Sequence, residues 1–149
     1  MFADGFLGRG ATLGADLNLL VQLGLGLLLL VGMGLARRGA YRAHGFCQAS
    51  AFIVTLALTF AWMIPSLRDI YAPSLVRGVV NRVNVAVAAH VVLGSAVLLL
   101  GAWVVLVAAT PLVPARLRFQ NYKLWMRTLL SLWWAEIALG ALTYFWATS

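Results

Sequence analysis

Residues 83–108 read VNVAVAAHVVLGSAVLLLGAWVVLVA and contain no Asp, Glu, Lys or Arg. An α-helix needs about twenty apolar residues to cross the roughly 30 Å hydrocarbon core of a bilayer. This stretch is long enough, and it lacks the strict alternation of polar and apolar residues that is typical of a transmembrane β-strand. It therefore predicts a membrane-spanning helix.

Three similar stretches occur elsewhere in the chain, and they cover approximately residues 16–36, 46–67 and 125–146. The chain is 63% hydrophobic and 10% charged, whereas soluble proteins carry about 25% charged residues. A backbone inside hydrocarbon must satisfy its own hydrogen bonds, and runs of this length do so as helices. We therefore predict an all-α integral membrane protein, in which residues 1–149 form one domain, a bundle of four transmembrane helices.

Most charged residues lie in the three segments between these stretches, which we expect to be loops: residues 37–44, 68–82 and 109–123. Cytoplasmic loops carry the excess of Lys and Arg. The first and third segments, with the start of the last helix, hold most of the 11 Lys and Arg residues: Arg37, Arg38, Arg42, Arg116, Arg118, Lys123 and Arg127. This distribution predicts a multi-pass protein of the bacterial inner (cytoplasmic) membrane with both termini on the non-cytoplasmic side.

The basic charge of the chain bears on its partners, because the formal net charge is +7 at pH 7. In a soluble protein this excess would suggest nucleic acid. Here the charges lie beside the ends of predicted membrane helices, where anionic lipid headgroups attract them. We therefore expect the lipid bilayer and its anionic lipids as partners, together with other membrane protein subunits, and no nucleic acid.

Glycines are frequent in the predicted spans. Small residues on a membrane helix allow another helix backbone to approach closely. The contact can lie within the bundle or against a partner subunit, and the sequence is compatible with both. The candidate helix-packing residues are Gly24, Gly26, Gly32, Gly34 and Gly94.

Two histidines are the candidate cofactor-binding residues. His90 shares a helix face with Ala86 and Gly94, and these small neighbours leave room either for a flat group such as haem or a pigment, or for close helix packing. His44 is expected at the cytoplasmic edge, about 15–20 Å from His90 along the membrane normal by helical rise, too far for both to ligate one haem. The single Cys47 lacks the partners of a Cys-based metal site, and we predict no metal site built from protein side chains.

Further polar side chains are expected at about the depth of His90, in the non-cytoplasmic half of the bundle. Polar groups inside a span are costly and tend to face the bundle interior or a cavity. Glu136 is the one carboxylate placed well inside a span; it is either protonated and hydrogen bonded to a neighbour, or it relays protons or binds a metal. The predicted polar pocket comprises Gln22, Thr59, Glu136, Thr143 and Tyr144.

The last helix carries a spaced set of residues, T-x4-W-x6-G-x3-Y, made by Thr128, Trp133, Gly140 and Tyr144. With His44 and His90, this set resembles the small four-helix membrane proteins of the CtaM/YozB type, over most of the chain. The resemblance implies a part in cytochrome oxidase assembly or haem-A-linked maturation, with the two histidines as candidate ligands. The family pattern has further histidines near the end of the second helix and just before the fourth, where this chain has other residues, and this departure favours a structural role.

Three functions are compatible with these features. The first is an accessory subunit of a respiratory or photosynthetic membrane complex that takes part in electron transport. The alternatives are an assembly or maturation factor for a haem-copper oxidase, which handles haem or metal, and a haem- or pigment-binding subunit with a single histidine ligand. The sequence contains no nucleophile triad, phosphate loop or metalloprotease motif, so we do not expect an enzyme.

Overall fold

The computed structural model describes residues 4–110, 113–114, 116 and 118–149. In these residues the long helices are α1 (Leu13–Arg37), α2 (Tyr41–Leu58), α5 (Arg82–Ala109) and α6 (Tyr122–Ala147), with short helical elements between α2 and α5. The structure contains four helical segments long and apolar enough to cross a membrane. The prediction of an all-helical chain with four candidate spans is therefore confirmed.

The second span is longer than the sequence predicts. We expected its helix to end near residue 67 and a loop to cover residues 68–82, but helical structure continues to Val76. It passes through four short elements: η1 (Thr59–Met63), α3 (Ile64–Ser66), η2 (Leu67–Tyr71) and α4 (Ala72–Val76). We call residues 59–76 the arm.

Two prolines, Pro65 and Pro73, explain the irregular path of the arm. Proline has no amide hydrogen, and its ring collides with the carbonyl four residues earlier, so it interrupts a regular α-helix. A π-helical turn lies before each proline; ahead of Pro65, the amide of Ile64 donates to the carbonyl of Thr59, five residues back. The wider turn absorbs the misfit, and the charged segment after residue 67 is therefore helical.

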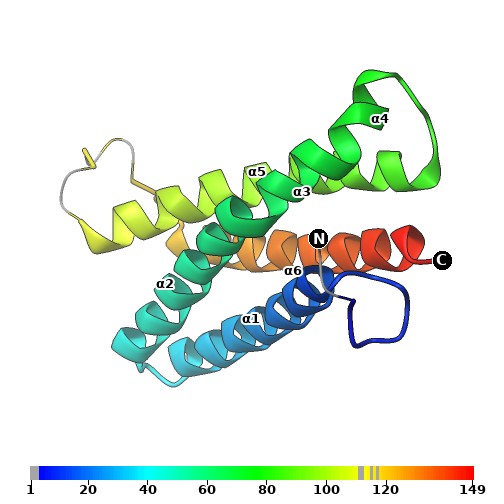
Figure 1. Ribbon diagram of the computed structural model, residues 1–149. Coiled ribbons are helices and arrows are strands. Elements are labelled where there is room, and N and C mark those ends of the chain that lie inside the picture. Colours follow the sequence, from blue (N-terminus) through cyan, green and yellow to red (C-terminus); the bar gives the residue numbers. More distant parts are fainter. Residues whose placement is uncertain (1–3, 111–112, 115, 117) are drawn as a thin grey trace.

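The helices form two antiparallel hairpins, α1 with α2 and α5 with α6, and α1 also packs against α6 (Figure 1). The segment before α1, the start of α5 and the C-terminal residues lie at the same end of the molecule, because Arg9 donates to Thr148 Oγ1 at 3.3 Å and Arg82 donates to Ser149 Oγ at 2.8 Å. We call this the terminal end. The α1–α2 turn and the segment 109–123 lie at the other end; residues 111, 112, 115 and 117 of that segment are outside the described residues.

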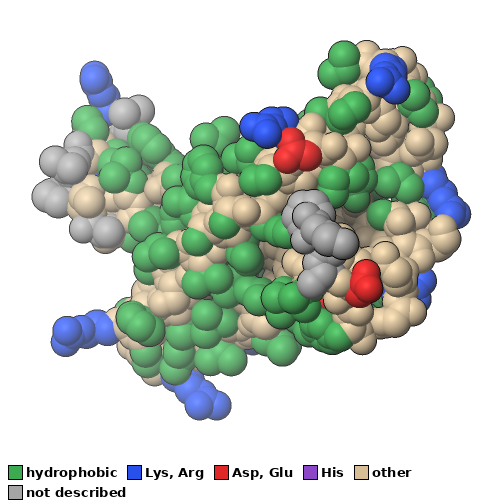
Figure 2. All heavy atoms as spheres, viewed as in Figure 1, with side chains coloured by type: hydrophobic (Ala, Val, Ile, Leu, Met, Phe, Trp, Pro, Cys, Tyr) green, Lys and Arg blue, Asp and Glu red, His purple; other side chains and the backbone are tan. Residues whose placement is uncertain are grey.

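The protein interior is small, and it lies where α1 and α2 meet the α5–α6 hairpin. Its fully buried side chains include Leu29 and Val97. Most other apolar side chains point outward, and Figure 2 shows them covering the face between the two ends, with Lys and Arg mainly toward the ends. This distribution is the one expected of helices whose outer faces contact lipid.

The glycines of α1 divide into two groups. A Cβ atom at Gly26 would lie 2.8 Å from Ile137 of α6, and one at Gly32 would lie 3.2 Å from Cys47 of α2, so both allow close helix contacts. At Gly24 and Gly34, an added Cβ would meet nothing within 4 Å. These two glycines therefore contribute nothing to packing among the described residues.

Candidate functional site

A cavity of about 670 Å³ lies in the terminal half of the bundle. All four spans contribute to its wall, with Gln22 from α1, Thr55 from α2, His90 from α5 and Glu136 from α6. Its volume falls within the range of about 300–1,000 Å³ that is usual for small-molecule and cofactor sites. The cavity is therefore large enough for a cofactor-sized ligand.

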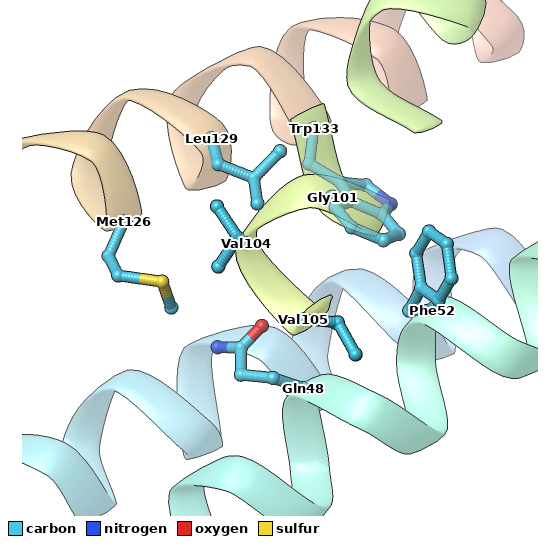
Figure 3. Close-up of a pocket in the computed structure, with 8 residues that line it drawn as sticks. All are labelled: Gln48, Phe52, Gly101, Val104, Val105, Met126, Leu129 and Trp133. Carbon is cyan, nitrogen blue, oxygen red and sulfur yellow. The ribbon is translucent and has the colours of Figure 1, made fainter. Parts of the chain in front are cut away.

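The indole of Trp133 forms the floor of the cavity. Trp133 lines the large cavity and also a separate void of only about 20 Å³, whose lining residues are drawn in Figure 3. Around that void, Phe52 of α2 packs against Gly101 of α5, where a Cβ atom would lie 3.2 Å from the phenyl ring. Gln48 also borders the void, which is about the size of one water molecule. The large cavity thus ends at Trp133.

His90 and Glu136 face each other across the α5–α6 interface. Nδ1 of His90 lies 3.0 Å from Oε1 of Glu136, and the two side chains are 25% and 14% exposed. Two glycines create the space for this pair: a Cβ atom at Gly94 would lie 2.5 Å from the Glu136 carboxylate, and one at Gly140 would lie 3.0 Å from the His90 ring. The pair can form because α5 and α6 lack side chains at these two positions.

Five of the buried polar atoms that lack a hydrogen-bond partner among the described residues belong to residues that line this cavity. More than about 90% of buried polar groups in proteins are hydrogen bonded, and each one left without a partner costs about 1–3 kcal/mol. Nδ1 of His90 is included although Oε1 of Glu136 lies 3.0 Å away, because the pair does not have hydrogen-bond geometry. The atoms are Asn18 Oδ1, Gln22 Nε2, Thr55 Oγ1, His90 Nδ1 and Glu136 Oε2.

The residues of the predicted polar pocket all line this cavity. Three of them already have partners: Thr59 and Thr143 donate to carbonyls of their own helices, and Tyr144 donates to Asp16. Gln22 and Glu136 therefore remain as the predicted pocket residues with a buried polar atom that lacks a hydrogen-bond partner among the described residues.

The second candidate histidine, His44, lies apart from the cavity. Its Nδ1 is 2.8 Å from the carbonyl oxygen of Gly32, beside the α1–α2 turn, and it is not part of the cavity wall. Ala86 is buried in the protein and does not line the cavity. A flat group resting on both Ala86 and Gly94 does not fit this arrangement, because the Glu136 carboxylate lies over Gly94. Any ligand therefore approaches His90 from the cavity side.

Sequence reasoning missed Asp16, which organises the terminal end. Its side chain accepts hydrogen bonds from the amides of Phe6 and Leu7, at 2.7 and 2.8 Å, and from the hydroxyl of Tyr144 at 2.6 Å. Asp16 is only 1% exposed, and it fixes residues 4–12 over the end of α1. The available signal was a carboxylate at the start of an otherwise apolar stretch; likewise, the i, i+4 spacing of Asn18 and Gln22 places both on one helix face.

The donor set limits the kinds of cofactor that this site can hold. Among the described residues, no three His, Cys, Asp or Glu side chains lie close enough to bind a metal ion together. His90 is the one histidine among the residues that line the cavity, and its Nδ1 faces a carboxylate. A histidine that ligates a metal through Nε2 usually has such a carboxylate partner at Nδ1. The arrangement thus suits a cofactor that brings its own metal and needs one imidazole.

Comparison of the chain with models of protein families, with curated proteins and with solved structures found no match. The resemblance to the CtaM/YozB type therefore stays a prediction.

Proposed function

We propose that this chain is a multi-pass membrane protein that binds a haem, or a related flat pigment with a central metal, in the cavity, where His90 would be the residue that ligates the metal. One observation carries the proposal: buried polar atoms of Asn18, Gln22, Thr55 and Glu136 that lack hydrogen-bond partners among the described residues line the same cavity as His90, whose Nδ1 faces the Glu136 carboxylate. A polar ligand edge beside them would remove the cost of leaving them unpaired.

Each residue of the wall has a distinct part in this proposal. Glu136 orients the His90 ring and increases the basicity of its free nitrogen. Gln22 and Asn18 hydrogen bond to polar substituents at the edge of the ligand. Trp133 limits how deeply the ligand enters. When bound, the metal would supply one-electron redox chemistry, and the protein would tune it through the axial ligand and the surrounding hydrogen bonds.

The setting proposed for this protein is an accessory subunit of a respiratory or photosynthetic complex, a binding role and not an enzymatic one. Gly24 and Gly34 support this, because a Cβ atom added at either position on α1 would meet nothing within 4 Å, so that a partner helix can approach closely. A haem-copper oxidase assembly factor is the second candidate, and the residues favouring it are the same His90 and Glu136. A subunit remains in fixed ratio with its complex in mild detergent, whereas an assembly factor is substoichiometric.

The proposed orientation places both termini on the non-cytoplasmic side of the bacterial inner membrane. Its support is the excess of Lys and Arg in the segments 37–44 and 109–127. Cytoplasmic loops carry such an excess, and anionic lipid headgroups would bind these side chains. In this orientation the cavity lies in the non-cytoplasmic half of the bilayer.

To test the proposal, the protein is purified from membranes in mild detergent, and any bound pigment is extracted and quantified. We expect about one haem or related pigment per chain, the ratio set by a single axial histidine. A preparation that contains no pigment, and that takes up no added haemin, would contradict the proposal.

A further inference from the structure

Packed groups border the cavity on three sides. At its floor lies Trp133. At the terminal end, residues 4–12 are tied to Asp16, and Gly10 of this segment contributes to the wall. Between the arm and α1, the ring of Trp62 packs directly on Gly14, where a Cβ atom would collide with the indole. A ligand would have to displace packed groups to pass on any of these sides.

At the terminal end the exposed residues of the wall are small, whereas between the arm and α5 larger exposed side chains also line the cavity. Ile64 and Ile70 of the arm are 45% and 50% exposed, and Leu99 of α5 is 74% exposed, yet all three belong to the cavity wall. Ser95 of α5 is also exposed and also lines the cavity. We call the gap bordered by these four residues the lateral opening.

Packed contacts frame the lateral opening at both ends. Toward the terminal end, Ser74 donates to Asn84 Oδ1 at 3.0 Å and ties the arm to the start of α5. Toward the middle of the bundle, Phe52 packs against Gly101. At a rise of 1.5 Å per residue, the part of α5 between these contacts is about 25 Å long. Between them the arm makes only isolated contacts with α5.

We infer that the ligand enters and leaves the cavity sideways, from the hydrocarbon of the bilayer, through the lateral opening. Three of the four residues around it are apolar, as a path for a membrane-dissolved molecule requires, and the hydroxyl of the fourth, Ser95, donates to a carbonyl of its own helix. The side chains of His90 and Glu136 are less exposed. The ligand is therefore an amphiphile that partitions into lipid: its polar edge reaches His90, and its apolar part rests against Ile64, Ile70 and Leu99. This inference rests on the proposed function, because the ligand is the His90-bound pigment.

The test is the rate of haemin uptake by the full chain in phosphatidylcholine vesicles, followed by the Soret absorbance after mixing with haemin-loaded, protein-free vesicles. Ser95→Trp places a large ring in the lateral opening and removes only a hydrogen bond to the Val91 carbonyl of the same helix. Val92→Trp is the matched control: Val92 lies on the same helix, is 72% exposed and is not part of the cavity wall. Leu99→Trp is a second variant of the opening.

We expect Ser95→Trp and Leu99→Trp to slow uptake about tenfold or more, since an obstructed entrance alters the rate of a gated step. Val92→Trp should match wild type. Equal uptake rates in all variants would overturn the inference. Faster uptake by Asp16→Asn, together with no effect of Ser95→Trp, would also overturn it, because that result would place the entrance at the terminal end. A wild-type protein that binds no haemin would overturn the proposed function as well, and the lateral route with it.

Discussion

Gly94→Ala is a small change with a large predicted effect on ligand binding. The added Cβ atom would lie 2.5 Å from Oε1 of Glu136, whereas ordinary contacts begin near 3.4 Å. The carboxylate must therefore move by about 0.9 Å, the difference between these distances. It can move because it ends a flexible side chain, but the movement disrupts its 3.0 Å contact with His90. Loss of the carboxylate partner of a metal-ligating histidine typically lowers affinity about 10–100-fold.

The measurement is an equilibrium titration of purified protein with haemin, read from the Soret band. We expect Gly94→Ala to weaken binding about 10–100-fold. Its control, Gly24→Ala, introduces the same methyl group at a position with nothing within 4 Å, and it should bind as wild type does. The helices should tolerate both changes, because alanine favours a helix over glycine by about 1 kcal/mol. Equal affinities of the two variants would refute the role given to Glu136.

Three other predictions concern stability, the terminal end and topology. Leu29→Ala should lower the free energy of unfolding in mixed detergent by about 2–5 kcal/mol, because Leu29 is only 1% exposed. The control Leu27→Ala, at a position that is 60% exposed, should have little effect. Similar losses of stability in the two variants would contradict this description of the interior. Asp16→Asn should speed amide hydrogen exchange in residues 4–12, since the carboxylate accepts two amides there, and unchanged exchange would show that other contacts hold the segment. A cysteine replacing Ser149 should react with an impermeant thiol reagent from the non-cytoplasmic side; labelling only after lysis would reverse the proposed orientation.

The four spans were predictable from sequence because hydrophobicity and length decide whether a helix crosses a membrane. The irregular arm was not predictable in the same way. Pro65 and the charged residues after it are typical of a loop, and the sequence does not show that π-helical turns accommodate the two prolines within a helix. The approach of His90 to Glu136 depends on how α5 and α6 are rotated about their axes, which periodicity alone does not fix. Asp16 and Tyr144 are far apart in sequence, and only the return of α6 beside α1 brings them together.

The most direct test of the account compares absorption spectra of the protein, oxidised and then reduced with dithionite, for wild type, His90→Ala and His44→Ala. His44 serves as the matched control because it lies beside the α1–α2 turn and is not part of the cavity wall. We predict a Soret band in wild type and His44→Ala that is lost in His90→Ala. A wild-type spectrum without visible absorption, or a band that survives in His90→Ala, would contradict the claim that His90 ligates a pigment in this cavity.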